Sequence, residues 1–131
     1  GSPPMNLLSF SGAVKRGDRA VRLNGGNVAL PEVHEDQAEA ELVLGVRPEH
    51  VRLVDSAALR GEVFGAEYLG TTQIITIKTA HGGVKARVPS DMKAQIGETV
   101  GLEFRPEKLS LFLKESGRAL RTALHDGGAH G

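Results

Sequence analysis

Apolar residues recur at every second position in several short stretches of this chain, and this alternation constrains the fold more than any other feature. Residues 84–88 place Val84, Ala86 and Val88 on one side of an extended chain and Lys85 on the other. The same alternation recurs in residues 8–11, 21–23, 42–47, 99–104 and 109–113. A period of two with one apolar face is the pattern of a half-buried antiparallel strand.

Glycine and proline separate these stretches. The chain has 131 residues, among them 17 glycines and 6 prolines, with glycines at 25–26 (after Asn24), 82–83 and 97. Many short strands joined by glycine turns predict a β-sandwich or a small β-barrel. Residues 61–70 alternate poorly, and we expect a bulge at Gly65.

Signals for helices are few. Residues 34–41 contain helix-forming residues but no apolar stripe, so we expect an exposed acidic loop or a single turn there. Residues 55–60 predict one short turn with Asp55 at its N-cap. The fold class expected from the pattern is therefore all-β, with short helical turns.

A charged interruption of the alternation occurs twice, as GVRPEHVRL at 45–53 and as EFRPEKLSL at 103–111. When Arg47 is aligned with Arg105, the apolar positions match on both sides, so the buried face stays in register. Pro48 suits the first position of a helical turn because its missing N–H costs nothing there. We therefore expect each copy to form a strand, a short corner and a second strand, and we interpret Arg-Pro-Glu as architectural.

The repeat predicts two similar β-subdomains, residues 1–54 and 55–118, followed by a flexible C-terminal tail at 119–131. A unit of about 60 residues buries only about 60% of its unfolded surface. Neither subdomain should therefore be stable alone, and we expect the two to pack together.

Charge and residue content argue against several functions. The chain carries 16 basic and 16 acidic residues, so its net charge attracts neither nucleic acid nor an anionic membrane. Cysteine is absent, which excludes disulfides, thiolate metal sites and cysteine nucleophiles. No apolar run approaches the ~18 residues of a membrane span, and no signal peptide opens the chain.

The sequence predicts no catalytic residue and no metal ligand. The five histidines are scattered, and no Gly-x-Ser-x-Gly elbow is present to organise a nucleophile. We expect His81, beside the glycine pair of a hairpin tip, to be solvated. We also expect His50 to be exposed at its corner.

Four blocks of sequence, in order, resemble the C-terminal part of sugar-importer ABC ATPases, the maltose and glycerol-3-phosphate importers among them. The blocks are GSPPMNLL (1–8), GVRPEHVRL (45–53), GEVFGAEYLGTTQIITIKT (61–79) and GETVGLEFRPEKLSLF (97–112). In that family this region is a regulatory domain of OB-like β-barrels, called TOBE. The resemblance thus implies an all-β fold of two packed OB-like small β-barrels.

The catalytic motifs of that family are missing from the chain. It contains no G-x-x-x-x-G-K-[ST] phosphate loop, no LSGGQ signature and no apolar run ending in Asp-Glu. The resemblance therefore implies that ATP and magnesium belong to the rest of a parent protein. We expect this chain to bind no cofactor and not to be an enzyme.

The resemblance implies a regulatory and dimer-contact domain of the ATP-binding subunit of an importer for sugars or related solutes. The implied partners are a second copy of the subunit, as a weak homodimer when isolated, and the membrane permease subunits. The implied location is cytoplasmic, peripheral to the inner face of the cell membrane. The candidate partner contacts are Arg47, Glu49, His50, Glu67 and Tyr68. Burial of Tyr68 beside Phe64 is an equally open alternative.

Two other functions stay open. One is a small-ligand or oxyanion sensor, as some TOBE-containing transporters and molybdate-binding proteins are, although no cluster of arginine and serine marks a pocket. The other is an OB-type nucleic-acid-binding domain, which needs a basic groove and stacking aromatics. One tyrosine, four phenylalanines and no tryptophan argue against the latter.

Overall fold

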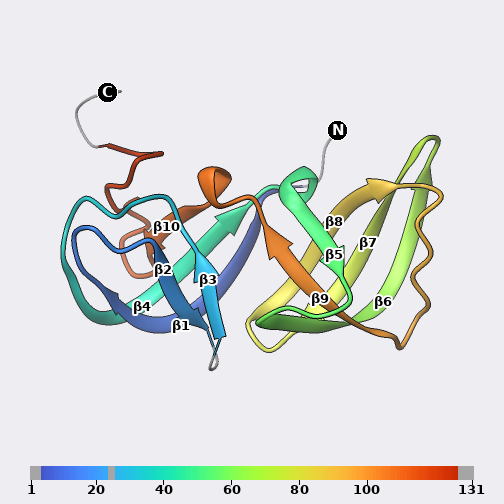
Figure 1. Ribbon diagram of the computed structural model, residues 1–131, viewed down its shortest axis with the longest axis horizontal. Coiled ribbons are helices and arrows are strands. Elements are labelled where there is room, and N and C mark those ends of the chain that lie inside the picture. The colour runs from blue at the N-terminus through green and yellow to red at the C-terminus, as the bar shows by residue number, and fades with distance from the viewer. Residues whose placement is uncertain (1–3, 24–25, 127–131) are drawn as a thin grey trace.

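The computed structural model describes residues 4–23 and 26–126. Within these residues it contains ten strands and two short 3₁₀ helices, η1 and η2 (Figure 1). The elements are β1 (Asn6–Val14), β2 (Ala20–Leu23), β3 (Gly26–Ala29), β4 (Gln37–Val46), η1 (Pro48–His50), β5 (Val51–Val54), β6 (Leu59–Leu69), β7 (Thr72–Thr79), β8 (Gly82–Pro89), β9 (Thr99–Phe104), η2 (Pro106–Lys108) and β10 (Ser110–Leu113). The prediction of an all-β, OB-like fold is confirmed.

The strands form antiparallel sheets in two lobes that lie side by side in Figure 1. One lobe contains the three-stranded sheet β1-β4-β10 and the hairpin β2-β3, and the other contains the five-stranded sheet β5-β9-β6-β7-β8. The five-stranded sheet curls until its edge strands β5 and β8 approach one another. The sheets are OB-like without forming a closed barrel in the described part of the chain.

The two Arg-Pro-Glu corners are the points at which the chain passes from one lobe to the other. η1 leads from β4 into β5, and η2 leads from β9 back into β10. Each corner begins at an extended arginine, Arg47 or Arg105, and has its proline in the first turn. The corners also touch, because the backbone N–H of Arg105 donates to the carbonyl of His50 at 3.1 Å. The predicted strand–corner–strand unit is therefore confirmed in both copies.

The expected subdomains, residues 1–54 and 55–118, do not coincide with the two lobes. Strand β5, at the end of the first range, pairs with β9, and β10, near the end of the second, pairs with β4. Each lobe therefore takes strands from both ranges, because the corners exchange them. Whether the two ranges behave as separate units stays a prediction.

A single cluster of buried apolar side chains runs through both lobes. The alternation at 84–88 is confirmed, since Val84, Ala86 and Val88 are all buried. Val46 and Val51, on either side of η1, are buried as well. Because the apolar face continues through the corner, the lobes share one core.

A polar contact also joins the lobes, between β1 and β8. The side-chain amide of Asn6 donates to the carbonyl of Lys85 and accepts from its N–H, both at 2.8 Å. Further along, the N–H of Ser9 donates to the carbonyl of His81 at 3.2 Å. The Asn6 side chain thus replaces a backbone partner for part of the β8 edge.

Residues 34–41 differ from the expected acidic loop or single turn. Strand β4 begins at Gln37 and pairs with β1, which supplies backbone partners that the local sequence does not reveal. Just before β4, the Glu35 carboxylate accepts two hydrogen bonds of 3.0 Å from the Arg118 guanidinium and one from the Arg121 N–H. The hydrogen bond from Arg118 lowers the pKa of Glu35, and Glu35 raises the pKa of Arg118.

Residues 119–126 differ from the expected flexible tail. Leu120 is fully buried, and Thr122 bridges to Val33 in the loop before β4. The segment is held in place because Leu120 packs in the core. The backbone of Arg121 and Ala123 also forms hydrogen bonds with residues 32–35. Residues 127–131 of the expected tail lie outside the described residues.

The predicted bulge is confirmed, because the β6–β7 register shifts between Val63 and Gly65. The helical turn expected at 55–60 is wrong: residues 55–58 form only bends, and β6 begins at Leu59, because strand pairing with β9 takes over there. Of the expected glycine turn at 24–26, residues 24–25 lie outside the described residues.

Candidate functional site

The five predicted contact residues fall on two separate parts of the molecule. Arg47, Glu49 and His50 belong to the η1 corner, between the lobes, whereas Glu67 and Tyr68 belong to the distal half of β6, at the far end of its lobe (Figure 1). The structure therefore does not bring the five residues into one site.

At the corner, the arginine and the glutamate are exposed but the histidine is not. His50 is half-buried, and its Nδ1 is buried without a hydrogen-bond partner in the described part of the chain. His81 is also half-buried, with its Nδ1 at 3.0 Å from the Ser9 carbonyl. The expectation that both histidines are exposed is wrong, because η1 packs against β8 and the β7–β8 turn packs against β1.

At the end of β6, the aromatic side chains are exposed. Tyr68 is 67% exposed and Phe64 is 56% exposed, so the alternative of Tyr68 buried beside Phe64 is wrong. The Phe64 ring instead lies below the Lys78 ammonium, 5.6 Å from nitrogen to ring centroid. Leu69 and Ile96 are also large, apolar and exposed. We call Phe64, Tyr68 and Leu69, which all lie on β6, the distal patch.

The β6 strand loses one of its neighbours as it reaches the distal patch. Its first residues, from Leu59 to Glu62, pair with β9, and Val63 exchanges hydrogen bonds with the loop at 97–98. Beyond this point, the ladders of the described strands pair β6 with β7 alone. The hairpin is nevertheless anchored, because the buried Gln73 of β7 donates to the carbonyls of Pro89 and Met92. The distal patch therefore lies on an open edge of β6, in a β6–β7 hairpin that is anchored to the rest of the lobe.

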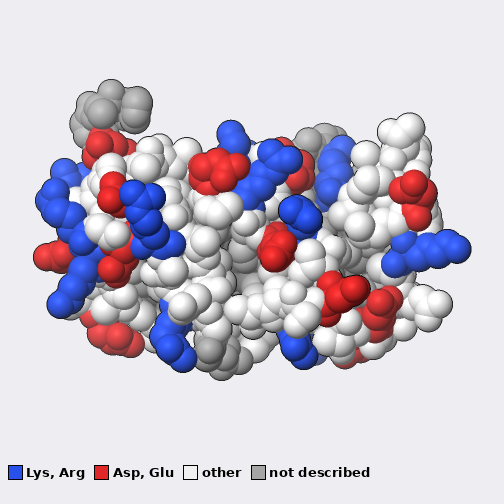
Figure 2. Space-filling model, viewed as in Figure 1, with Lys and Arg blue, Asp and Glu red and all other residues white. Residues whose placement is uncertain are grey.

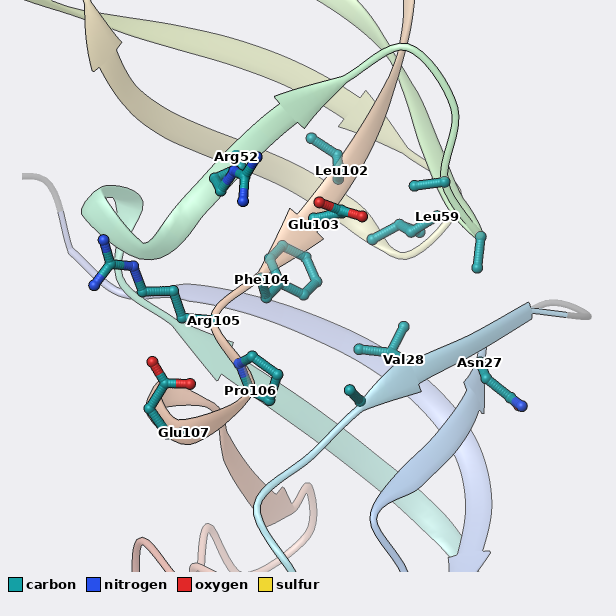
Figure 3. A pocket seen from close by; sticks show the side chains of 13 residues that line it. Asn27, Val28, Arg52, Leu59, Leu102, Glu103, Phe104, Arg105, Pro106 and Glu107 are labelled. Atoms are coloured by element: carbon teal, nitrogen blue, oxygen red, sulfur yellow. The ribbon is translucent and has the colours of Figure 1, made fainter.

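A groove of about 680 Å³ lies between the β2–β3 hairpin of one lobe and strands β5 and β9 of the other (Figure 3). Its apolar lining includes Val28, Leu59, Leu102 and Phe104. Figure 3 shows the Phe104 ring in the middle of the groove, with Val28 across from it. The groove could not be predicted from local sequence, because its walls come from distant parts of the chain.

Four charged side chains line the same groove. Arg52 on β5 stands opposite Glu103 on β9 in the strand ladder, and Arg105 and Glu107 belong to the η2 corner (Figure 3). Glu103, Arg105 and Glu107 recur at every second position, so their spacing is a signal from which part of this lining could have been found. The opposing wall, at residues 27–29, has no such signal.

Two glycines allow close packing at one end of the groove: Gly26 packs the hairpin against the second lobe, and Gly101 packs β9 against the β5–β6 connection within the second lobe. A Cβ atom on Gly26 would lie 2.4 Å from the Cβ of Ala58, and one on Gly101 would lie 2.7 Å from the backbone nitrogen of Ala57. Real Cβ atoms do not approach other atoms so closely. The close approach therefore depends on glycine at both positions.

Charges of both signs are mixed over the face shown in Figure 2. This face lacks the continuous basic surface that a nucleic-acid-binding OB domain uses. Within residues 4–23 and 26–126, no three His, Asp or Glu side chains are grouped so that they could hold a metal ion.

Neither short helix in the described part of the chain has the length or the apolar character that crossing a membrane requires.

Two family models match the chain in succession. Residues 1–51 match the MalK OB fold domain, and residues 44–112, more than half of the chain, match the TOBE domain. The chain belongs to the TOBE domain family.

This TOBE chain is similar to two ATP-binding import proteins. It is 31% identical over 125 residues to the sn-glycerol-3-phosphate import ATP-binding protein UgpC of Chromobacterium violaceum. This match covers 94% of the chain and 34% of UgpC. It is 36% identical over 130 residues to the maltose/maltodextrin import ATP-binding protein MalK of Escherichia coli. This match covers 92% of the chain and 35% of MalK. The TOBE chain thus spans about a third of the length of these relatives. It matches their C-terminal region and not their catalytic domain.

Among solved structures, the TOBE chain resembles the cytoplasmic molybdate-binding protein ModG with molybdate bound. The TM-score is 0.62 at 15% sequence identity, and the match covers 81% of this chain and 94% of the ModG chain. At this identity the likeness shows a common fold alone.

Proposed function

We propose that this chain is the regulatory and dimer-contact domain of the ATP-binding subunit of an ABC importer for sugars or related solutes. The observation that carries the proposal is the succession of OB and TOBE matches, in a chain that aligns over more than nine-tenths of its length with two ATP-binding import proteins. ATP and magnesium then bind in the remainder of the parent protein. The parent lies at the cytoplasmic face of the membrane, beside its permease subunits.

In this role the domain acts as a tether between two ATP-binding subunits. A persistent contact between the two C-terminal domains raises the effective concentration of one catalytic half for the other. A ligand or protein that prefers one arrangement of the domains would bias the ATPase cycle by its differential affinity alone. No catalytic residue in this chain is required.

The distal patch is the surface best suited to the contact between subunits. Exposed aromatic and apolar side chains are typical anchors of protein interfaces, and an open strand edge has backbone groups free to pair with another chain. Glu67 and Tyr68, two of the predicted contact residues, lie on this edge. The corner residues Arg47, Glu49 and His50 stay predicted contacts.

Self-association of the chain tests the contact. Sedimentation equilibrium from low micromolar to near-millimolar concentration should reveal a dimer with a dissociation constant on the order of micromolar, corresponding to roughly 8 kcal/mol of binding free energy. Tyr68→Ser should weaken the dimer at least about fivefold, because an interface tyrosine commonly contributes more than ~1 kcal/mol. Leu7→Ser is the matched control, since Leu7 is 58% exposed on β1, away from the distal patch.

Two outcomes would contradict the proposal in different ways. A monomer over the whole concentration range would reject self-association of this domain. An equal effect of Leu7→Ser and Tyr68→Ser would reject the distal patch as the contact. Titration calorimetry with ATP supplies an independent check, since saturable micromolar binding would show that the chain holds a nucleotide site of its own.

A further inference from the structure

The groove between the lobes contains two arginines and two glutamates whose charges cancel. Within residues 4–23 and 26–126, the side chains of Arg52, Arg105, Glu103 and Glu107 make no ion pair with the chain itself. Even Arg52 and Glu103, which face each other across the β5–β9 ladder, are not joined in this way. The groove therefore offers guanidinium donors and carboxylate acceptors at the same time.

This balance of charge favours a neutral, hydroxyl-rich ligand. An anion in the groove would meet two carboxylates, and a cation would meet two guanidinium groups, so neither is selected by net charge. A hydroxyl group can accept a hydrogen bond from an arginine and donate one to a glutamate, and it satisfies both kinds of side chain.

The apolar part of the lining suits the other half of such a ligand. The Phe104 ring lies in the middle of the groove, with Val28 across from it and Pro106 beside it (Figure 3). A sugar ring presents C–H groups on its faces and hydroxyl groups on its edges, so an aromatic side chain can cover a face while polar side chains bind the edge. The volume of about 680 Å³ falls among the few hundred to about 1,000 Å³ of small-molecule sites.

The groove is also formed before any ligand arrives. The close contact between Gly26 and Ala58 holds the β2–β3 hairpin against the second lobe at one end. Leu59 and Leu102 are buried in the common core below. A wall that is already held in place costs little ordering entropy on binding.

We propose that the groove between β2–β3 and β5–β9 is a binding site for a neutral mono- or disaccharide. Phe104 covers a face of the sugar ring, with Val28 across from it, and Arg52 and Glu103 bind its hydroxyl groups. The site does not depend on the proposed dimer contact, which lies at the far end of the second lobe (Figure 1).

Nuclear magnetic resonance of the ¹⁵N-labelled chain tests the site directly. Glucose, galactose, maltose, sucrose and trehalose are titrated separately to high millimolar concentration, with glycerol 3-phosphate and inorganic phosphate as anionic probes. At least one neutral sugar should shift the amide resonances of Asn27, Ala58 and Phe104 in a saturable manner. Distal-patch amides should not respond, so the result is read separately from the self-association of the chain.

Matched variants then separate specific binding from weak surface contact. Glu103→Gln keeps the shape of the side chain but removes its charge, and it should weaken sugar binding at least about tenfold, since hydrogen bonds to charged groups are the strong ones. Glu62→Gln, at an exposed position of β6 outside the groove, should leave the affinity unchanged. Unaltered resonances away from the groove show that each variant is folded.

The alternative outcomes overturn the proposal. Saturable shifts in the groove with phosphate or glycerol 3-phosphate, but with no neutral sugar, would identify an anion site instead. Absence of saturable shifts with every sugar, or equal affinities of the wild type and Glu103→Gln, would exclude a sugar site in this groove.

Discussion

Pro48 and Pro106 occupy equivalent positions in the two corners, yet the structure buries them differently. Pro48 is buried within η1, whereas Pro106 is half-buried in η2. The pair therefore separates two contributions of a corner proline, the restriction of the unfolded chain and the packing of the ring. We expect Pro48→Ala to destabilise the protein more than Pro106→Ala does.

The magnitudes follow from the two contributions. Loss of the proline restriction costs about 0.4–1 kcal/mol at either site. Alanine also lacks two ring methylenes, and at ~0.8 kcal/mol for each buried methylene their loss at Pro48 adds about 1.6 kcal/mol. At the half-buried Pro106 the same loss adds roughly half as much. We therefore expect about 2–2.6 kcal/mol for Pro48→Ala and about 1.2–1.8 kcal/mol for Pro106→Ala.

Equilibrium unfolding in urea, followed by far-ultraviolet circular dichroism, measures both losses. Similar dependence of the unfolding free energy on urea in all three proteins would show that the denatured states are comparable. Equal losses at the two sites would refute the packing argument. A loss below about 0.4 kcal/mol at both sites would refute the view that the corner prolines restrict the chain at all.

Two further predictions concern the polar contacts. Asn6→Ala should cost about 1–3 kcal/mol and speed hydrogen exchange of the Lys85 amide, because it leaves the partly buried N–H and carbonyl of Lys85 without a partner. Ser9→Ala, which keeps its backbone contact to His81 in the β7–β8 turn, is the control, and equal exchange rates in the two variants would contradict the reasoning. The Arg118 hydrogen bond lowers the pKa of Glu35 below its ordinary 4.5, so its contribution to stability is full above the unfolded-state pKa and is lost as the pH falls through the folded-state pKa. Glu35→Gln should accordingly lose less unfolding free energy than the wild type when acidified below about pH 4.5, and parallel stability curves against pH would exclude this role.

The sequence by itself determined the local structure of this protein. Alternation at 84–88 predicts a half-buried strand whatever its neighbours are, because successive side chains of a strand point to opposite faces. The two corners follow from proline, which holds the preceding arginine extended and sets its own backbone angle for a turn. Gly65 marks the bulge in β6 for a similarly local reason. The order of the four family-like blocks also sufficed to indicate the TOBE family.

Only the tertiary structure decided which strands become neighbours and which side chains are buried. Residues 34–41 lack an apolar stripe, yet most of them form β4 because β1 pairs with them. Leu120 stands near a glycine-rich end, yet it is fully buried in the common core. The groove exists because the corners carry β5 and β9 into one lobe and leave the β2–β3 hairpin in the other. The free energies of these contacts depend on residues tens of positions apart, and no local window of the sequence contains both partners.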